Sequence, residues 1–458
     1  MNRTCGHRSV HLALLGAALL GTVAAGGDPE LIGYEVEPAP AGPLSAVIAP
    51  EVPGHPLTVS IDPASGILMA FVESPGNPAD GSGLGAVAIS YRIAVFEITN
   101  PQWVEFLNAM AAADPNGLYN DGMTDSDRGG IVRNGVSGSY TYAVKPNFEN
   151  KPANWFNWYD AARFCNWLHH GKPAGAQGPA TTEDGAYDLS LPGGQTTRKA
   201  GAKYFIPTHD EWYKAAYYDP FDAGADAGGT PDYWLYPIRS DSPPTLALAT
   251  ANGDVANPGP GVANMAGGAD WNGENGNVTT VGGAMALNAW GIFDPAGNIN
   301  EQTETSGPPI PPNPPDQPDP LPTRRIRGGD FANPVALAAS PAGFAPALNM
   351  AAEAANIGLR VAARFCPLAA DPTNLFVDRE GVDLLLEWDD LGQTSSWNLY
   401  REMTPDPSDW GSPHAPFVSD EDPVEQGIQY RDVGALSAGS PLFYLVTANN
   451  FCGESPLD

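Results

Sequence analysis

The chain has 458 residues, of which 22 are Lys or Arg and 53 are Asp or Glu, so its formal net charge is −31. A surface of this sign repels phosphate backbones, so we exclude nucleic acid as a partner. Apolar residues make up 42% of the chain, enough for a sizeable core, whereas 52 Gly and 47 Pro exclude a helical bundle. The composition therefore predicts short strands joined by long loops, in two or three domains.

The N-terminus has the pattern of a secretory signal peptide. Arg3 and Arg8 precede an apolar run over residues 12–20, and small residues at 23–25 supply a cleavage site. An anchoring helix is disfavoured, because the run has about half of the ~20 residues that a membrane span needs. We therefore predict a signal peptide over 1–25, a Pro- and Ala-rich leader over 26–56, secretion to the extracellular space or periplasm, and no membrane span after cleavage.

The cysteines are few and uneven. Loss of Cys5 with the signal leaves Cys165, Cys366 and Cys452, an odd number. Cys366 and Cys452 flank the C-terminal segment and could pair in an oxidising compartment, or remain unbridged. Cys165 lies in a Trp- and Phe-rich segment, so we predict a buried apolar residue rather than a nucleophile.

Three helices are predicted in the central region. The first has Thr99 or Asn100 as its N-cap, and Pro101 occupies its first helical position. The second starts at Asn157, and the third begins with Thr208, which forms a capping box with Glu211. Apolar residues at helical spacing give each helix an inner face: Trp103, Phe106, Leu107 and Met110; Ala161, Phe164, Cys165 and Leu168; Trp212, Ala215 and Ala216.

Strands and long loops fill the rest of this region. Residues 57–72 predict two strands around a turn, and residues 86–97 predict another. The Gly-, Asn- and Asp-rich stretch 222–285 is too long for an ordinary connection, and its scattered aromatics favour a loop held by trapped rings and ions over disorder. The Pro-rich segment 307–322 predicts an exposed insertion between two strands.

The pattern changes after residue 367 to that of a small all-β module. Residues 382–388, 397–401 and 442–448 read as strands separated by Pro, Asp, Ser and Gly turns. We predict a sandwich over 372–458 that resembles a fibronectin type III module of secreted bacterial proteins.

Six segments between residues 96 and 362 follow one another in a characteristic order. They are FEITNPQW at 96–103, KPANWFNWYDA at 151–161, IPTHDEW at 206–212, WGIFDPAGNINE at 290–301, RGGDF at 327–331 and IGLRVA at 357–362. Together they resemble the formylglycine-generating enzyme, or sulfatase-modifying factor, family. The resemblance implies an α+β fold over 57–366: a loop-rich, C-type lectin-like domain.

The activity of that family depends on two cysteines after the RGGDF-like motif. As thiolates they bind copper(I), a soft metal, and activate oxygen to convert a sulfatase cysteine to formylglycine. The corresponding segment here, 331–356, contains neither Cys nor His. Without a thiolate there is no copper site and no nucleophilic sulfur, and Ser340 cannot replace either function. We therefore predict no catalytic residues, no copper and a pseudoenzyme.

The histidines do not supply another catalytic site. Iron-dependent sulfoxide synthases, a related branch, use a His-x3-His-x-Glu pattern. No such spacing is present among His55, His169, His170, His209 and His414. The adjacent His169 and His170 are explained by their place at a helix end. We predict that His209, in the first turn of a helix, is exposed.

The resemblance also implies metal candidates. Asn298 and Glu301 match the family's Gly-Asn-x-x-Glu, and Asn252 and Asp254 lie in a loop that resembles its other calcium region. Their oxygens suit a hard cation, so we predict a structural Ca²⁺ as the one candidate cofactor. The alternative, that these side chains cap turns, stays open at each position.

Several other residues of the motifs are predicted to be structural. Arg327 and Arg360 should be buried and paired with carboxylates or carbonyl oxygens, because the guanidinium offers a fixed fork of donors. Five tryptophans should belong to the core: Trp103, Trp158, Trp167, Trp212 and Trp290.

Three functions are compatible with the sequence. The favoured one is a secreted binding or scaffold protein for an extracellular protein or glycan, since appended sandwich modules are common spacers and adhesion units. The alternative is an oxidoreductase or protein-modifying enzyme of the formylglycine-generating family. The third is a structural component of the envelope. The sequence does not name the ligand, because lectin-like folds recognise varied partners through variable loops.

Overall fold

The computed structural model describes residues 58–190, 196–221, 232–308, 322–340 and 346–365 in full. It describes only the backbone of 226–227, 230–231 and the strands after residue 375. The signal peptide and leader predicted for residues 1–56 lie outside these ranges, as do Cys366 and Cys452. The chain divides into two compact units, Met1–Arg364 and Phe365–Asp458, a division close to the predicted limits of 57–366 and 372–458.

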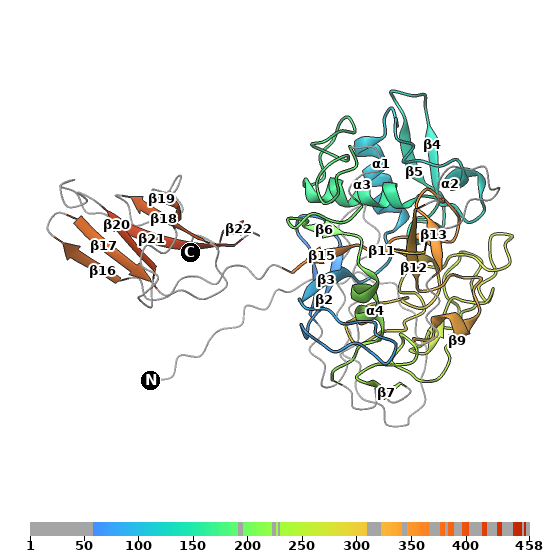
Figure 1. Cartoon of the computed structure of the whole chain (residues 1–458). Helices are drawn as coiled ribbons and strands as arrows, with labels where there is room; N and C mark the ends of the chain where they lie inside the picture. Colours follow the sequence, from blue (N-terminus) through green and yellow to red (C-terminus); the bar gives the residue numbers. More distant parts are fainter. Residues whose placement is uncertain are drawn as a thin grey trace, which may run out of the picture. The chain divides into compact units, whose positions relative to one another are not determined.

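The first unit contains a five-stranded antiparallel sheet (Figure 1). Its order is β1 (Val59–Ile61), β2 (Leu68–Val72), β3 (Tyr91–Ala94), β15 (Ala362–Arg364) and β6 (Tyr204–Phe205). The two strands predicted within 57–72 are confirmed, whereas the predicted strand 86–97 is shortened to four residues. Segments far apart in the sequence therefore meet in one sheet.

A second sheet carries the segments on either side of the Pro-rich insertion. Its order is β13 (Ala347–Asn349), β12 (Thr323–Arg327), β11 (Asn300–Ser306) and β14 (Ile357–Gly358), with only β11 and β14 parallel. The insertion 307–322 joins the antiparallel pair β11 and β12, as predicted, but most of it lies outside the described residues.

The three predicted helices are confirmed as α1 (Asn100–Met110), α3 (Trp158–His169) and α4 (His209–Tyr217). Thr99, Asn157 and Thr208 are their N-caps, and each completes a capping box. Two short elements were not predicted, the helix α2 (Gly122–Asp125) and the 3₁₀ turn η1 (Val335–Ala338). A single helical turn of this kind leaves little apolar periodicity in the sequence.

The main core is aromatic and lies between α1 and α3. Trp103 stacks on Phe156 with ring centroids 4.0 Å apart, and it also packs against Phe106 and Phe164. All five tryptophans predicted for the core are buried, which confirms that prediction. The hairpin of β4 (Ile131–Asn134) and β5 (Thr141–Val144) packs beside α1. Burial of rings on this scale supplies much of the apolar stabilisation of the unit.

The described part of the Gly-rich stretch is an ordered loop with two short strand pairings and several isolated bridges. The pairings are β7 (Asp226–Ala227) with β8 (Thr230–Pro231) and β9 (Thr245–Leu246) with β10 (Val262–Ala263). Trp271 is buried, donates from Nε1 to Val278 O at 2.8 Å and lies directly against Gly253. The trapped aromatics predicted for this loop are thus confirmed for these residues, whereas the predicted ions stay a prediction.

The second unit is described as seven strands in two antiparallel sheets. One sheet contains β16 (Phe376–Glu380), β17 (Asp383–Trp388) and β20 (Ile428–Asp432). The other has the order β19 (Ala415–Val418), β18 (Ser396–Glu402), β21 (Phe443–Asn450) and β22 (Gly453–Glu454). Among the described helices of the chain, none has the length and apolar character that crossing a membrane requires.

Two glycines separate the effects of backbone strain and steric overlap. Gly297 and Gly267 have φ of 83° and 71°, but only at Gly297 would a Cβ overlap a backbone oxygen, that of Asn264. We expect Gly297→Ala to lower the free energy of unfolding by about 3 kcal/mol and Gly267→Ala by about 1 kcal/mol. Denaturant unfolding checks this, and equal losses would contradict the packing described for Gly297.

Candidate functional site

The segment after β12 is where the family resemblance places two thiols. Gly328 and Gly329 have φ of 89° and 76° and turn the chain out of the strand. Asp330 follows and is buried. Its Oδ1 accepts two backbone N–H groups of the next turn, at 2.8 and 3.0 Å, and its Oδ2 accepts the amides of Asn300 and Asn356, at 2.6 and 2.7 Å. Both carboxylate oxygens of Asp330 therefore hold this segment in place.

No thiol accompanies this segment. Cys165, the one cysteine whose side chain the structure describes, lies in α3 and is fully buried. Burial raises the pKa of its thiol well above the usual value, so the thiol stays protonated and unreactive. The prediction of a buried, apolar Cys165 is confirmed. Ser340, in the same segment, is buried as well.

Arg327 and His209 form a buried pair, which corrects two predictions. His209 is not exposed: only 6% of it is accessible, and its Nε2 accepts a hydrogen bond from Arg327 Nε. Burial and the charges of Arg327 and Arg325 lower the pKa of His209 to about 3, so the ring is neutral and can accept. Arg327 is buried as predicted, but its partner is an imidazole nitrogen rather than a carboxylate or carbonyl oxygen.

Arg360 lies at the centre of a larger buried network, as predicted. Its Nη2 and Nε donate to Glu301 Oε1 at 2.7 and 3.0 Å, and Nε lies 2.9 Å from Oε2. The remaining donors reach the carbonyl oxygens of Ala94, Val95 and Phe293 at 2.8–3.0 Å. Glu301 also accepts from Trp212 Nε1 at 2.5 Å. One guanidinium therefore joins β3, β11, α4 and the loop before β11.

Asn298 is the second buried centre and has φ of 59°. Its Oδ1 accepts Thr279 N at 2.8 Å and Asn264 Nδ2 at 3.1 Å, and its Nδ2 donates to Glu97 Oε1 at 3.1 Å. Glu97 Oε2 lies 3.9 Å from Arg360 Nη2. Asn298 thus links the Gly-rich loop to the Arg360 network.

The acids around Arg360 outnumber it. Glu97, Asp294 and Glu301 are all buried there. Burial, with repulsion from Asp294, raises the pKa of Glu97 well above the usual value, and burial raises the pKa of Asp294 to about 6. The neutral form of Glu97 is therefore favoured inside the fold, and Glu301 contacts Arg360 more closely than Glu97 does. Sequence reasoning missed this role for Glu97, although an acid between Phe96 and Ile98 in an apolar run signals a buried carboxyl.

The four predicted calcium residues do not meet in one oxygen cluster. The side-chain oxygens of Asn298 and Glu301 are taken by the donors described above. Asp254 is more than half exposed and its Oδ1 accepts Thr280 Oγ1 at 2.5 Å and Lys151 Nζ at 3.3 Å. Asn252 is an exposed residue of the same turn. Within the described residues no group of three or more His, Cys, Asp or Glu side chains is suited to a metal ion.

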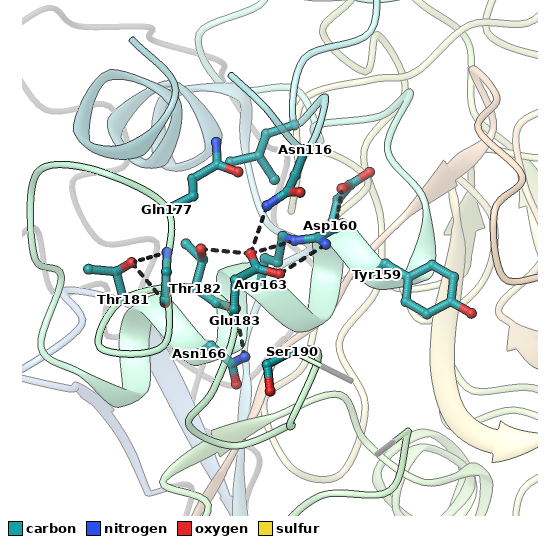
Figure 2. Close-up of polar contacts among 12 residues, drawn as sticks. Asn116, Tyr159, Asp160, Arg163, Asn166, Gln177, Thr181, Thr182, Glu183 and Ser190 are labelled. Carbon is teal, nitrogen blue, oxygen red and sulfur yellow. Dashed lines mark hydrogen bonds and ion pairs between the residues drawn. The ribbon is translucent and has the colours of Figure 1, made fainter. Parts of the chain in front are cut away.

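A cluster of polar side chains around Arg163 and Glu183, which we call the polar belt, connects two loops to the first half of α3 (Figure 2). Arg163 donates to both oxygens of Glu183, at 2.9 and 3.1 Å, and lies 3.4 Å from Asp160 Oδ1. Glu183 also accepts from Asn116 Nδ2 and Thr182 Oγ1, each at 2.9 Å. Burial raises the pKa of Asp160 to about 8. The belt positions the loop 114–122 beside α3.

The buried acids predict a particular dependence of stability on pH. Because the folded pKa values of Glu97 and Asp294 are raised, the folded state keeps protons that the unfolded state releases above pH ~4. The free energy of unfolding should fall as pH rises from that point through about 6. Glu97→Gln should reduce this slope with little loss of stability at pH 7.

Glu301→Gln is the variant to compare with Glu97→Gln in this measurement of stability against pH. It removes the carboxylate that pairs with the buried Arg360, so we expect a loss of about 3 kcal/mol at pH 7. Denaturant unfolding of both variants from pH 4 to 8 checks the assignment. Equal losses for the two variants, or an unchanged slope for Glu97→Gln, would contradict it.

Chelation tests the calcium prediction, which the internal hydrogen bonds of Asn298 and Glu301 disfavour. Since internal donors take the oxygens of Asn298 and Glu301, we expect EDTA to leave the melting temperature unchanged. A decrease in EDTA that added Ca²⁺ reverses would show a bound ion, which would then require different ligands.

Comparison with known proteins assigns the first unit. No curated protein matches the chain. Three solved structures are similar: Treponema denticola variable protein 1 (16% identity, 65% of this chain and 95% of the other, TM-score 0.34), CarF (15%, 66% and 100%, 0.39) and PvdO from Pseudomonas aeruginosa (16%, 68% and 99%, 0.35). Residues 85–365, more than half of the chain, match the model of the sulfatase-modifying factor enzyme 1-like domain. The chain therefore belongs to the sulfatase-modifying factor family.

Proposed function

We propose that this chain is a secreted, ligand-binding member of the sulfatase-modifying factor family that lacks the cysteine-dependent oxidase reaction. One observation carries the proposal: residues 331–356 contain no cysteine, and Cys165 is fully buried in α3. The reaction needs a thiolate both to bind copper(I) and to react with oxygen. A buried, protonated thiol on a different element supplies neither function.

The polar residues of the first unit support the same proposal. Internal hydrogen bonds occupy polar side-chain atoms of four residues of this unit: Asp330, Glu301, Asn298 and Asp160. The pKa of His209 is too low for proton transfer near pH 7, because the ring is buried beside Arg327. These groups serve to hold loops in place, which suits the presentation of a binding surface.

The C-terminal unit supports a role in attachment or spacing. Its first, second and fifth strands pair in one sheet, and the other four pair in the second. Strands that follow one another in sequence thus change sheets, as in Greek-key sandwiches, and this favours a fibronectin type III-like module. The basic start and apolar run of residues 1–25 favour secretion.

The proposal predicts that the mature chain makes no aldehyde. The purified chain, from residue 26 onward, would be loaded with copper(I), exposed to oxygen and given a peptide with a Cys-x-Pro-x-Arg sequence. A hydrazide probe should detect no formylglycine, whereas a family member with both cysteines should label the same peptide. Cys165→Ser should behave like the unchanged chain. Aldehyde formation by the chain would favour the alternative, an oxidoreductase of the family.

A further inference from the structure

Trp155 has a strained backbone conformation. Its φ is 61°, in the left-handed region, where a bulky side chain is unfavourable. The residues on either side, Asn154 and Phe156, are buried, and Phe156 stacks on Trp103. Strain of this kind persists only where the surroundings impose it, and it is concentrated at functional positions.

The indole of Trp155 lies directly against the backbone of α2. A Cβ on Gly122 would come within 2.5–2.8 Å of three atoms of the ring, so only glycine allows this approach. The backbone N–H of Trp155 donates to Ala354 O at 3.1 Å. Trp155 is half-buried, and its Nε1 is buried without a partner among the described residues. The part of the indole that solvent reaches is therefore carbon.

Glu353 directly precedes Ala354, whose carbonyl oxygen accepts the Trp155 N–H. Its carboxylate accepts hydrogen bonds from Asn120 Nδ2 and from Asn157 Nδ2, the latter at 2.7 Å. Asn120 Oδ1 in turn accepts Gly122 N at 2.7 Å, so the same loop contacts both the ring and the carboxylate. Glu353, Asn120 and Asn157 are all half-buried. The carboxylate is thus fixed in orientation but still within reach of solvent.

The surrounding elements keep these groups in place. Asn157 is the N-cap of α3, and its Oδ1 accepts two N–H groups of the first turn. The loop that carries Asn120 is anchored by the bond from Asn116 to Glu183, within the belt of Figure 2. Preorganised polar groups beside an apolar ring lose little conformational entropy when a ligand binds.

We propose that Trp155 and Glu353, with Asn120 and Asn157, bind a neutral saccharide. A sugar ring has a C–H face that packs on an indole, and hydroxyl groups that donate to carboxylate oxygens. Glu353 accepts only two of the roughly four hydrogen bonds that a carboxylate can accept, so it has room for sugar hydroxyls. The net charge of −31 disfavours anionic sugars. The inference rests on the proposed function as a binding module.

Saturation-transfer NMR on the mature chain tests the inference. The probes are the methyl glycosides of glucose, galactose, mannose and N-acetylglucosamine. We expect saturation of the ring C–H protons of at least one glycoside. Trp155→Gly should weaken that binding by about tenfold, since it removes the stacking surface. Glycine adopts φ of 61° without strain, so this variant should fold.

Two further variants separate ligand binding from structure. Glu353→Gln keeps the shape but weakens the acceptor, so affinity should fall. Val136→Ala, at the exposed tip of the hairpin β4–β5, should bind the glycoside like the unchanged chain. The inference is overturned if no glycoside is saturated, or if Trp155→Gly binds as tightly as the unchanged chain. The inference would also be overturned if the chain bound tetralysine and none of the glycosides. None of these results depends on aldehyde formation, which decides the proposed function separately.

Discussion

The first unit depends on one buried ion pair, that of Arg360 with Glu301. Arg360 connects its carboxylate partner on β11 to the carbonyl oxygens of Ala94, Val95 and Phe293, and Trp212 of α4 donates to the same carboxylate. Removing two charges from water is costly unless each polar atom finds a partner. Here nearly every donor of the guanidinium does, and the network ties the two sheets to a helix and a loop that are distant in sequence.

This constraint explains how a loop-rich unit can be well ordered. Glycines allow rings and backbone to approach closely, as where Trp271 lies against Gly253 and the Trp155 indole against Gly122. Buried amides such as Asn298 then satisfy the backbone groups that regular structure would otherwise pair. The network does not require the thiols that follow β12 in active family members. We therefore propose that the fold does not depend on the oxidase chemistry, as the proposed function requires.

Local signals were sufficient for part of this structure. The capping boxes at Thr99, Asn157 and Thr208 predicted the helix starts, because a cap involves residues only three apart. The family motifs predicted the fold class and the burial of Arg360. The partner of Arg327 was not predictable, since His209 lies 118 positions away in the sequence and its burial depends on how α4 meets β12. The positive φ of Trp155 likewise results from tertiary contacts with α2 and with the segment before β14.

The candidate sites, too, depend on tertiary contacts that local sequence signals do not predict. Asn298 and Glu301 were predicted to be calcium ligands, whereas the structure shows their oxygens accepting hydrogen bonds from internal donors. The saccharide site we propose combines a loop, a helix cap and a segment near the end of the unit, a juxtaposition that no single stretch of sequence contains. A double-mutant cycle on Glu301→Gln and Arg360→Met measures the central constraint most directly. We predict strong coupling, of about 3 kcal/mol, in the free energy of unfolding, with the double variant losing much less than the sum of the single losses. Additive losses would contradict the account.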